Sequence, residues 1–291
     1  EMCIRDRLFL SSNHSYLLYF TDMGRVYRTK TYNIPEAGRT AKGTPVVNII
    51  EKSPEEKISE IIPVKEFSDN EYLVMVTKNG VIKKTPASEY ESIRKSGKIA
   101  ITLKEGDELI SIFKTTGNDN IFLATRNGMA ICFNENDARA VGRTASGVEA
   151  IDLADGDYVV GAEPVREDSK VLLVTDGGYG KCTDLTSFRI QHRGGKGLKA
   201  YKITEKTGNI IGISMVNDSE ELIMVTSEGV VIRIRIKDIA TTTGRITQGV
   251  RLINLNDGVI VVSMDKISAE DTVEEESEEN NTEVTAETTE E

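Results

Sequence analysis

The sequence predicts an all-β domain built from about five four-stranded repeats of roughly 50 residues, the arrangement of a propeller-like fold. One observation is a short apolar run followed by Thr-x-x-Gly, which occurs five times. A second is the spacing of the copies, because their last glycines lie 56, 48, 50 and 51 residues apart. A third is that two further apolar runs follow each copy. The copies are YLLYFTDMG (16–24), YLVMVTKNG (72–80), IFLATRNG (121–128), VLLVTDGG (171–178) and LIMVTSEG (222–229).

Each repeat begins with a predicted β-hairpin. The apolar runs are too short for helices and rich in branched or aromatic residues, and each ends in turn residues with a glycine that can take a positive φ. A second strand follows the turn and carries lysine or arginine in every copy except the third. These second strands are predicted at Val26–Thr29, Val81–Lys84, Met129–Cys132, Gly180–Thr183 and Val230–Ile236.

A third and a fourth strand complete each predicted unit. The third stretches read PVVNII, KIAITL, GVEAIDL, GLKAYKI and GVRLINL, and the fourth runs read ISEIIPV, ELISIFK, YVVGAEPV, IIGISMV and VIVVSMD. Neighbouring repeats are expected to bury each other's apolar faces. The body spans residues 8–267 and leaves no room for a second globular domain, with blades at about 8–66, 67–117, 118–166, 167–217 and 218–267.

The residues outside this body differ from it in composition. We expect residues 1–7 (EMCIRDR) to be an extraneous or truncated start, because they match nothing in the repeat, and at least part of another repeat to precede them. Residues 268–291 hold eleven acidic residues and no basic one, which predicts a disordered tail that is either solubilising or an internal mimic of a polyanion. Because the net charge is −11, the rest of the chain is neutral.

The composition indicates a globular protein, with 38% hydrophobic and 29% charged residues. No apolar run approaches the roughly 20 residues of a membrane helix, and no signal peptide precedes the first strand. We therefore expect a cytoplasmic protein without membrane contact. Cys3, Cys132 and Cys182 form no C-x-x-C pair and are interpreted as inert thiols, not as disulfides or zinc ligands.

Basic residues recur in the loop between the second and third strands. In four of the five repeats an arginine stands four residues before a glycine, and the second repeat has a basic cluster around Gly97. Acidic residues concentrate elsewhere, in the turn between the third and fourth strands. The alternatives are merely solvated loops or a basic rim that binds DNA phosphates. The residues expected to contact DNA in these loops and on the second strands are Arg39, Lys42, Lys83, Lys84, Arg94, Lys95, Lys98, Arg143, Arg233, Arg235 and Arg245.

The loop of the fourth repeat, QHRGGKG, is the most specific of these segments. Three glycines remove side chains, so that backbone N–H groups can approach a phosphate closely while cationic side chains add attraction. As a bare pattern, a glycine-rich basic loop is also common in flexible turns. We expect DNA contacts from Gln191, His192, Arg193, Gly194, Gly195, Lys196 and Gly197.

From about Arg7 to Ile267 the chain resembles the C-terminal domain of the A subunit of DNA gyrase. The segments GRVYRTKTYNIPEAGRTAKGTPVVNII, NGVIKKTPASEY, GDELI and GGYGK carry the resemblance, and QHRGGKG is similar to the family's glycine-rich basic box. The resemblance implies a β-pinwheel, a propeller variant that exchanges strands between blades and usually has six of them. The family's box normally lies in the first blade, whereas QHRGGKG lies in the fourth repeat of this chain.

The resemblance also implies a function. The family's domain wraps double-stranded DNA around its positive rim, so that the whole bacterial gyrase, an A2B2 assembly, can introduce negative supercoils with ATP and magnesium. In the family the cleavage tyrosine lies in an N-terminal region and the other subunit hydrolyses ATP, so we expect no active site, cofactor or metal in this chain. No P-loop or Ser/His/Asp arrangement appears in the sequence, and its histidines are His14 and His192.

Two alternatives stay open. The homologous domain of the A subunit of topoisomerase IV shares the blades, but it usually has a degenerate box and fewer repeats. A propeller can also serve protein–protein contact, because a fold does not fix a function. Salt dependence separates this alternative from DNA binding, since phosphate binding weakens with a log–log slope of about −0.9 per phosphate on duplex DNA.

Overall fold

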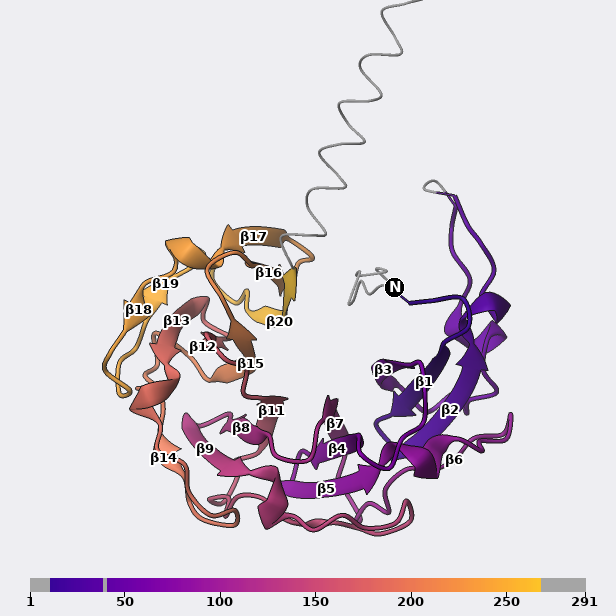
Figure 1. The fold of residues 1–291 in the computed structure, drawn as a ribbon. Coiled ribbons are helices and arrows are strands. Elements are labelled where there is room, and N and C mark those ends of the chain that lie inside the picture. Colours follow the sequence, from indigo (N-terminus) through magenta and orange to yellow (C-terminus); the bar gives the residue numbers. More distant parts are fainter. Residues whose placement is uncertain (1–10, 39–40, 268–291) are drawn as a thin grey trace, which may run out of the picture. The chain divides into compact units, whose positions relative to one another are not determined.

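The computed structural model describes residues 11–38 and 41–267 of the chain. Figure 1 shows the strands along the chain, and the contacts between residues divide the protein into two compact units. Of the described residues, those up to 166 and 188–202 form the N-terminal unit, and 167–187 and 203–267 form the C-terminal unit. The expectations for residues 1–7 and for the tail 268–291 lie outside the described residues. Among the residues described, no helix is long and apolar enough to cross a membrane.

Three antiparallel hairpins form the centre of the N-terminal unit, as the sequence predicts. Their branched and aromatic residues suit strands that are buried on both faces. Each turn ends in a glycine with a positive φ, such as Gly24 at 72°, where a Cβ would also lie 2.6 Å from the main-chain oxygen of Ile101. The hairpins are β1 (Tyr16–Thr21) with β2 (Arg25–Lys30), β4 (Tyr72–Thr77) with β5 (Val81–Pro86), and β8 (Asn120–Thr125) with β9 (Met129–Asn134).

Each of these hairpins gains one strand from its own repeat and one from the next repeat. The strands of the same repeat, which pair with the first strand of the hairpin, are β3 (Ile58–Val64), β7 (Leu109–Thr115) and β11 (Val159–Pro164). The strands from the next repeat, which pair with β2, β5 and β9, are β6 (Lys98–Ile99), β10 (Val148–Glu149) and β14 (Leu198–Lys199). A repeat of the sequence is therefore not one sheet, because its third stretch completes the sheet before it.

The third stretch of the first repeat differs from the prediction. PVVNII is predicted to be a strand, but Val46–Asn48 forms the 3-10 helix η2. The equivalent stretches of the other repeats become strands by pairing with the sheet of the preceding repeat. No such sheet precedes this stretch among the described residues, and a lone strand would leave its backbone groups without partners.

The C-terminal unit repeats the plan. The hairpin of β12 (Lys170–Thr175) and β13 (Tyr179–Asp184) is flanked by β15 (Ile210–Val216) and by two short strands of the fifth repeat, β18 (Thr241–Thr242) and β19 (Val250–Arg251). The last sheet contains β17 (Val231–Arg235), β16 (Glu221–Thr226) and β20 (Val261–Ile267). A short 3-10 helix follows the second strand of every hairpin: η1 (Thr31–Asn33), η3 (Ala87–Tyr90), η4 (Glu135–Asp137), η5 (Leu185–Ser187) and η6 (Ile236–Asp238).

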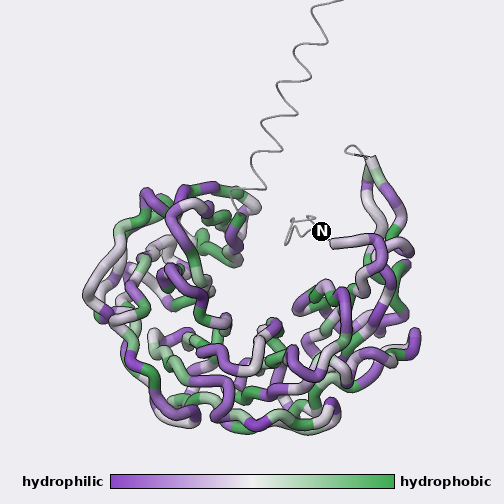
Figure 2. The backbone as a smooth tube through the Cα atoms, in the orientation of Figure 1, coloured by the Kyte–Doolittle hydropathy of each residue, from purple (hydrophilic) through white to green (hydrophobic). Residues whose placement is uncertain are grey.

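Successive sheets within a unit share buried apolar clusters. Phe20 of the first repeat packs edge to face on Tyr90 of the second, with ring centroids 5.8 Å apart. Val74 of the second repeat belongs to the same cluster as Leu123 of the third. Figure 2 shows hydrophobic and hydrophilic segments alternating along the chain. Burying a large apolar side chain stabilises a fold by roughly 1.5–3 kcal/mol, so the interfaces between repeats help to hold each unit together.

Candidate nucleic-acid interface

Three basic loops of the N-terminal unit are joined to one another by hydrogen bonds. We call residues 91–97, 139–147 and 189–197 the loop row. The first loop runs directly into β6, and the second loop is tied to that segment at two places. Arg143 Nη1 donates to the main-chain oxygen of Ile99, and the backbone N of Thr102 donates to Ala145 O over 3.3 Å. The second loop is therefore fixed beside the first.

The third loop is attached to the second in the same way. Arg193 Nη1 donates to the main-chain oxygen of Glu149 in β10 over 2.8 Å. The backbone N of Gly194 donates to Ala150 O over 2.7 Å, and the N of Asp152 donates to Gly195 O over 3.0 Å. The second loop thus bonds to β6, which follows the first loop, and the third loop bonds to β10, which follows the second loop. The row is therefore continuous within this unit.

The glycine-rich loop presents only part of its predicted donors to solvent. Lys196 and Gly195 are exposed, and the His192 side chain is 98% exposed and lies 3.3 Å from Asp137 Oδ2. Arg193 is half-buried, because its Nε donates to Asp137 O over 2.8 Å in addition to the bond to the neighbouring strand. Of Arg193 and Lys196, only Lys196 is therefore exposed to an anionic ligand.

Gln191 is placed differently from the prediction. Its backbone N donates to Cys132 O over 2.8 Å, but its side-chain Nε2 is buried and has no hydrogen-bond partner among the described residues. A buried amide nitrogen cannot meet a phosphate in solvent. The structure does not present this amide nitrogen to solvent, and the DNA contact of Gln191 stays a prediction.

The predicted phosphate contacts of Lys83 and Lys84 also need correction. Lys83 is 1% exposed and its Nζ donates to the main-chain oxygens of Ala100 and Arg143. Lys84 is 4% exposed, and its Nζ lies 2.8 Å from Glu135 Oε2. Both amines are turned into the protein and already bonded there, so the prediction that they contact phosphates is wrong.

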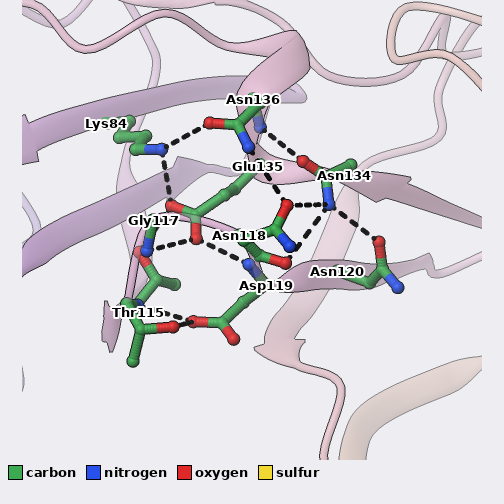
Figure 3. A network of polar contacts seen from close by, with 10 residues as sticks. Lys84, Thr115, Gly117, Asn118, Asp119, Asn120, Asn134, Glu135 and Asn136 are labelled. Carbon is green, nitrogen blue, oxygen red and sulfur yellow. Dashed lines mark hydrogen bonds and ion pairs between the residues drawn. The ribbon is translucent and has the colours of Figure 1, made fainter.

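The partner of Lys84 belongs to a buried polar network (Figure 3). Glu135 accepts hydrogen bonds from Thr115 Oγ1 at 2.7 Å, from the backbone N of Gly117 at 2.8 Å and from that of Asp119 at 2.7 Å. A buried carboxylate is tolerated only when it is paired and hydrogen bonded, and this one is satisfied on both oxygens. The network joins β5 of one sheet to η4, which follows β9 of the next.

The other predicted cations differ in their exposure and in their partners. Lys42, Arg94 and Lys95 are exposed, and Lys98 is half-buried on β6. Arg143 and Arg245 are half-buried, and Nη1 of Arg245 donates to Ser187 O over 3.1 Å. Arg233 and Arg235 are exposed but ion-paired to Glu221 and Asp238. Arg39 lies outside the described residues.

Two further exposed cations of the loop row, Arg139 and Arg189, were not predicted from the sequence. They stand at equivalent positions, four residues before Arg143 and Arg193, and both are exposed. Neither has a hydrogen bond or an ion pair from its side chain among the residues described. The repeat pattern could have revealed both residues, because an arginine stands four positions before the loop arginine in the third and fourth repeats.

These features define a class of protein: a repeat-built, propeller-like β domain whose sheets are completed by strands from the next repeat and whose connecting loops carry exposed cations. The family model of the DNA gyrase C-terminal domain, beta-propeller, matches residues 15–65, 71–116, 119–166, 169–217 and 220–268. The chain belongs to this family.

Relatives and solved structures agree with this assignment. The A subunit of DNA gyrase from Clostridium acetobutylicum is 52% identical over 266 residues, which cover 91% of this chain and 32% of that protein. The A subunit of DNA gyrase from Halalkalibacterium halodurans is 50% identical over 264 residues, which cover 91% of this chain and 32% of that protein. The chain thus spans about a third of the length of these relatives.

Among solved structures, the C-terminal domain of a DNA topoisomerase IV has a TM-score of 0.84 at 28% sequence identity. The match covers 93% of this chain and 84% of that domain. A DNA gyrase A C-terminal domain has a TM-score of 0.75 at 25% identity, with 88% of this chain and 83% of that one covered. The topoisomerase IV domain is a neighbour in fold, whereas the relatives with high sequence identity are gyrase A proteins.

Proposed function

We propose that this domain binds double-stranded DNA through its phosphates, without reading the base sequence, and bends the duplex along the loop row. The observation that supports the proposal most directly is the chain of hydrogen bonds that fixes the three loops side by side. Exposed cations whose side chains have no internal partner among the described residues follow this row. They are Arg94, Lys95, Arg139, Arg189 and Lys196.

The energy of bending requires several contacts to act together. Turning about 40 base pairs through a half circle costs roughly 11 kcal/mol for a persistence length of about 150 base pairs. A single phosphate contact supplies far less than this, whereas a row of fixed cations spreads the cost over many contacts. A continuous row is thus better suited to bending than isolated loops.

In the complete gyrase, the bend would direct strand passage so that negative supercoils are introduced. The partners of this function are the rest of the gyrase A protein and the gyrase B protein in an A2B2 assembly, which uses ATP and magnesium. The domain itself contributes DNA binding and no catalytic group, and it works in the cytoplasm on the chromosome. This proposal is supported by the gyrase A relatives, which extend well beyond the chain.

The test is the salt dependence of binding to two 40-base-pair duplexes of unrelated sequence, followed by fluorescence anisotropy. Five phosphate contacts predict a log–log slope near −4.5, with equal affinity for the two duplexes. Arg139→Ala with Arg189→Ala should flatten the slope by about 1.8. The matched control is Lys57→Ala with Lys104→Ala, two exposed lysines that precede the fourth strands outside the row. A slope near zero would instead favour a protein-interaction propeller.

A further inference from the structure

Two buried lysines lie at the same position of two repeats and point at the loops of the repeats that follow. Lys83 and Lys181 are each the third residue after the turn glycine, Gly80 or Gly178. They are 1% and 0% exposed. Both amines bond to main-chain oxygens, whereas the amine of Lys84 pairs with the carboxylate of Glu135.

The amines are bonded to the main chain of the arginine loops. Lys83 Nζ donates to the oxygen of Arg143, in the third repeat, and to that of Ala100, which follows β6. Lys181 Nζ donates to the oxygens of Gly244, at 3.4 Å, and Arg245, in the fifth repeat. Each amine thus holds the backbone of an arginine that the sequence predicts to contact DNA: Arg143 in the loop row, and Arg245 in the corresponding loop of the C-terminal unit.

The fourth repeat provides an internal contrast. In the sheet beneath its loop, the position equivalent to Lys83 is Ile131, whose side chain offers no amine to hold the backbone. The loop arginine is instead held by Asp137, whose carboxylate Oδ2 accepts from the backbone N of Arg193 at 3.2 Å and whose main-chain oxygen accepts from Arg193 Nε at 2.8 Å. The loops of the third and fifth repeats are thus held by a buried lysine, and the loop of the fourth repeat is held by Asp137.

We propose that Lys83 and Lys181 are positioning residues for DNA binding: their charged amines hold the Arg143 and Arg245 loops in the conformation that meets the phosphates. This inference rests on the proposed function. A protonated amine offers three donors and an attraction to carbonyl dipoles that the neutral amine lacks. Loss of the proton should therefore loosen the loop, although neither lysine reaches DNA itself.

The surroundings of the two amines lower their pKa values into the physiological pH range. Burial lowers the pKa of Lys83 to about 7, with a further contribution from Arg143, while Glu89 opposes the shift. Burial and Arg245 lower the pKa of Lys181 to about 8. Tyr90 also faces Lys83, because its hydroxyl shares the Ala100 oxygen at 3.5 Å, and burial raises its pKa so that it stays neutral. DNA affinity should consequently fall between pH 7 and pH 9.

Stability should change in the opposite direction. In the unfolded chain both lysines return to the ordinary pKa near 10.5, so above pH 7 the unfolded state binds more protons than the folded state. The folded state therefore gains stability from these two groups as the pH rises from 7 to 9. A purely structural lysine would not make affinity fall while stability rises.

The experiment compares the protein with the double variant Lys83→Met, Lys181→Met at pH 7, 8 and 9, using a 40-base-pair duplex at constant ionic strength. The ordinary pKa of histidine lies below this window. For the unsubstituted protein we expect the Kd to rise by about 3-fold or more. The rise reaches about 50-fold if binding requires the charged form of Lys83 alone, and about 500-fold if it requires both charged amines. The double variant should bind more weakly at pH 7 and show no such rise. Its salt slope should be unchanged, because the lysines do not contact phosphates.

Lys84→Met is the matched control, since it removes a neighbouring buried amine that holds no loop arginine. It should keep the pH dependence. An unchanged pH dependence in the double variant, or a Kd independent of pH in the unsubstituted protein, would overturn the proposal. If the double variant does not fold, proton uptake on DNA binding, measured by calorimetry of the unsubstituted protein in two buffers, decides: no uptake between pH 7 and 9 overturns it. Absence of DNA binding at pH 7 and low salt would overturn the proposed function instead.

Discussion

Arg193 Nη1 donates to the main-chain oxygen of Glu149, 2.8 Å away, and so binds the two-residue strand β10 that completes the sheet of the second repeat. Arg143 makes the equivalent contact with Ile99 of β6. The arginine that recurs in the loops therefore has a structural role in addition to its charge. It fastens the strand that is exchanged between sheets.

Arg193 and Lys196 should consequently differ when each is replaced by alanine. Arg193→Ala should lower the free energy of unfolding by about 1–3 kcal/mol, because charge-assisted hydrogen bonds to the main chain are lost. Lys196→Ala should leave stability unchanged and flatten the salt slope of DNA binding by about 0.9. Urea unfolding and salt titrations of both variants measure these effects. Equal stability of the two variants would contradict the strand-fastening role.

The glycines of the same loop should separate backbone strain from access to DNA. Gly197 has a φ of 73°, and a Cβ there would lie 2.4 Å from Ala130 O, whereas the nearest atom to a Cβ at Gly195 is 3.9 Å away. Gly197→Ala should destabilise the fold by at least about 1 kcal/mol. Gly195→Ala should fold normally and weaken DNA binding if the phosphate approaches the backbone. Thermal unfolding measures the stability of both variants, and fluorescence anisotropy measures their DNA affinity. Unchanged affinity for Gly195→Ala would show that charge alone matters for binding by this loop.

Bending should weaken cumulatively as charges along the loop row are reversed. Lys95→Glu, Arg139→Glu and Arg189→Glu each alter one loop of the N-terminal unit, and every reversal removes an attraction and adds a repulsion. Single, double and triple variants should show progressively lower end-to-end transfer in a doubly labelled duplex. The control is Lys104→Glu, an exposed position outside the row. Normal bending by the triple variant would be incompatible with the row as the bending surface.

The Lys84–Glu135 pair should matter for stability and not for phosphate contact. Glu135→Ala should cost about 3–5 kcal/mol, because it leaves the buried ammonium of Lys84 without its counter-charge. Lys84→Met should cost less, since Thr115 and the backbone of Gly117 and Asp119 still bind the carboxylate. Urea unfolding ranks the two variants. A flatter salt slope of DNA binding in folded Lys84→Met would indicate that this lysine does reach a phosphate.

The acidic segment 268–291 should compete with DNA for the exposed cations as a tethered polyanion. Short linkers give effective concentrations in the millimolar range, so even a weak contact made by this segment would be populated. Removing these residues should tighten DNA binding at low salt, and the difference should shrink as salt screens the charges. Binding curves of the full and shortened chains at two ionic strengths measure this. Equal affinity at low salt would favour a solubilising tail.

The sequence by itself determined the repeats, the hairpins and the recurrence of arginine in one loop, because these depend on local patterns. Apolar runs of strand length, turn glycines such as Gly24 and fixed spacing of about 50 residues are readable without a partner segment. The structure confirms the fold class. The position of the basic loops within each repeat follows from the same repeat spacing.

Only the tertiary structure decided which basic residues face solvent. Lys83 and Lys84 point to opposite faces of β5, as alternation requires, yet both are buried. The segments that cover them, the Arg143 loop and Glu135, come from the next repeat. Strand exchange therefore hides cations that one repeat alone would expose, and a pattern confined to that repeat cannot reveal it.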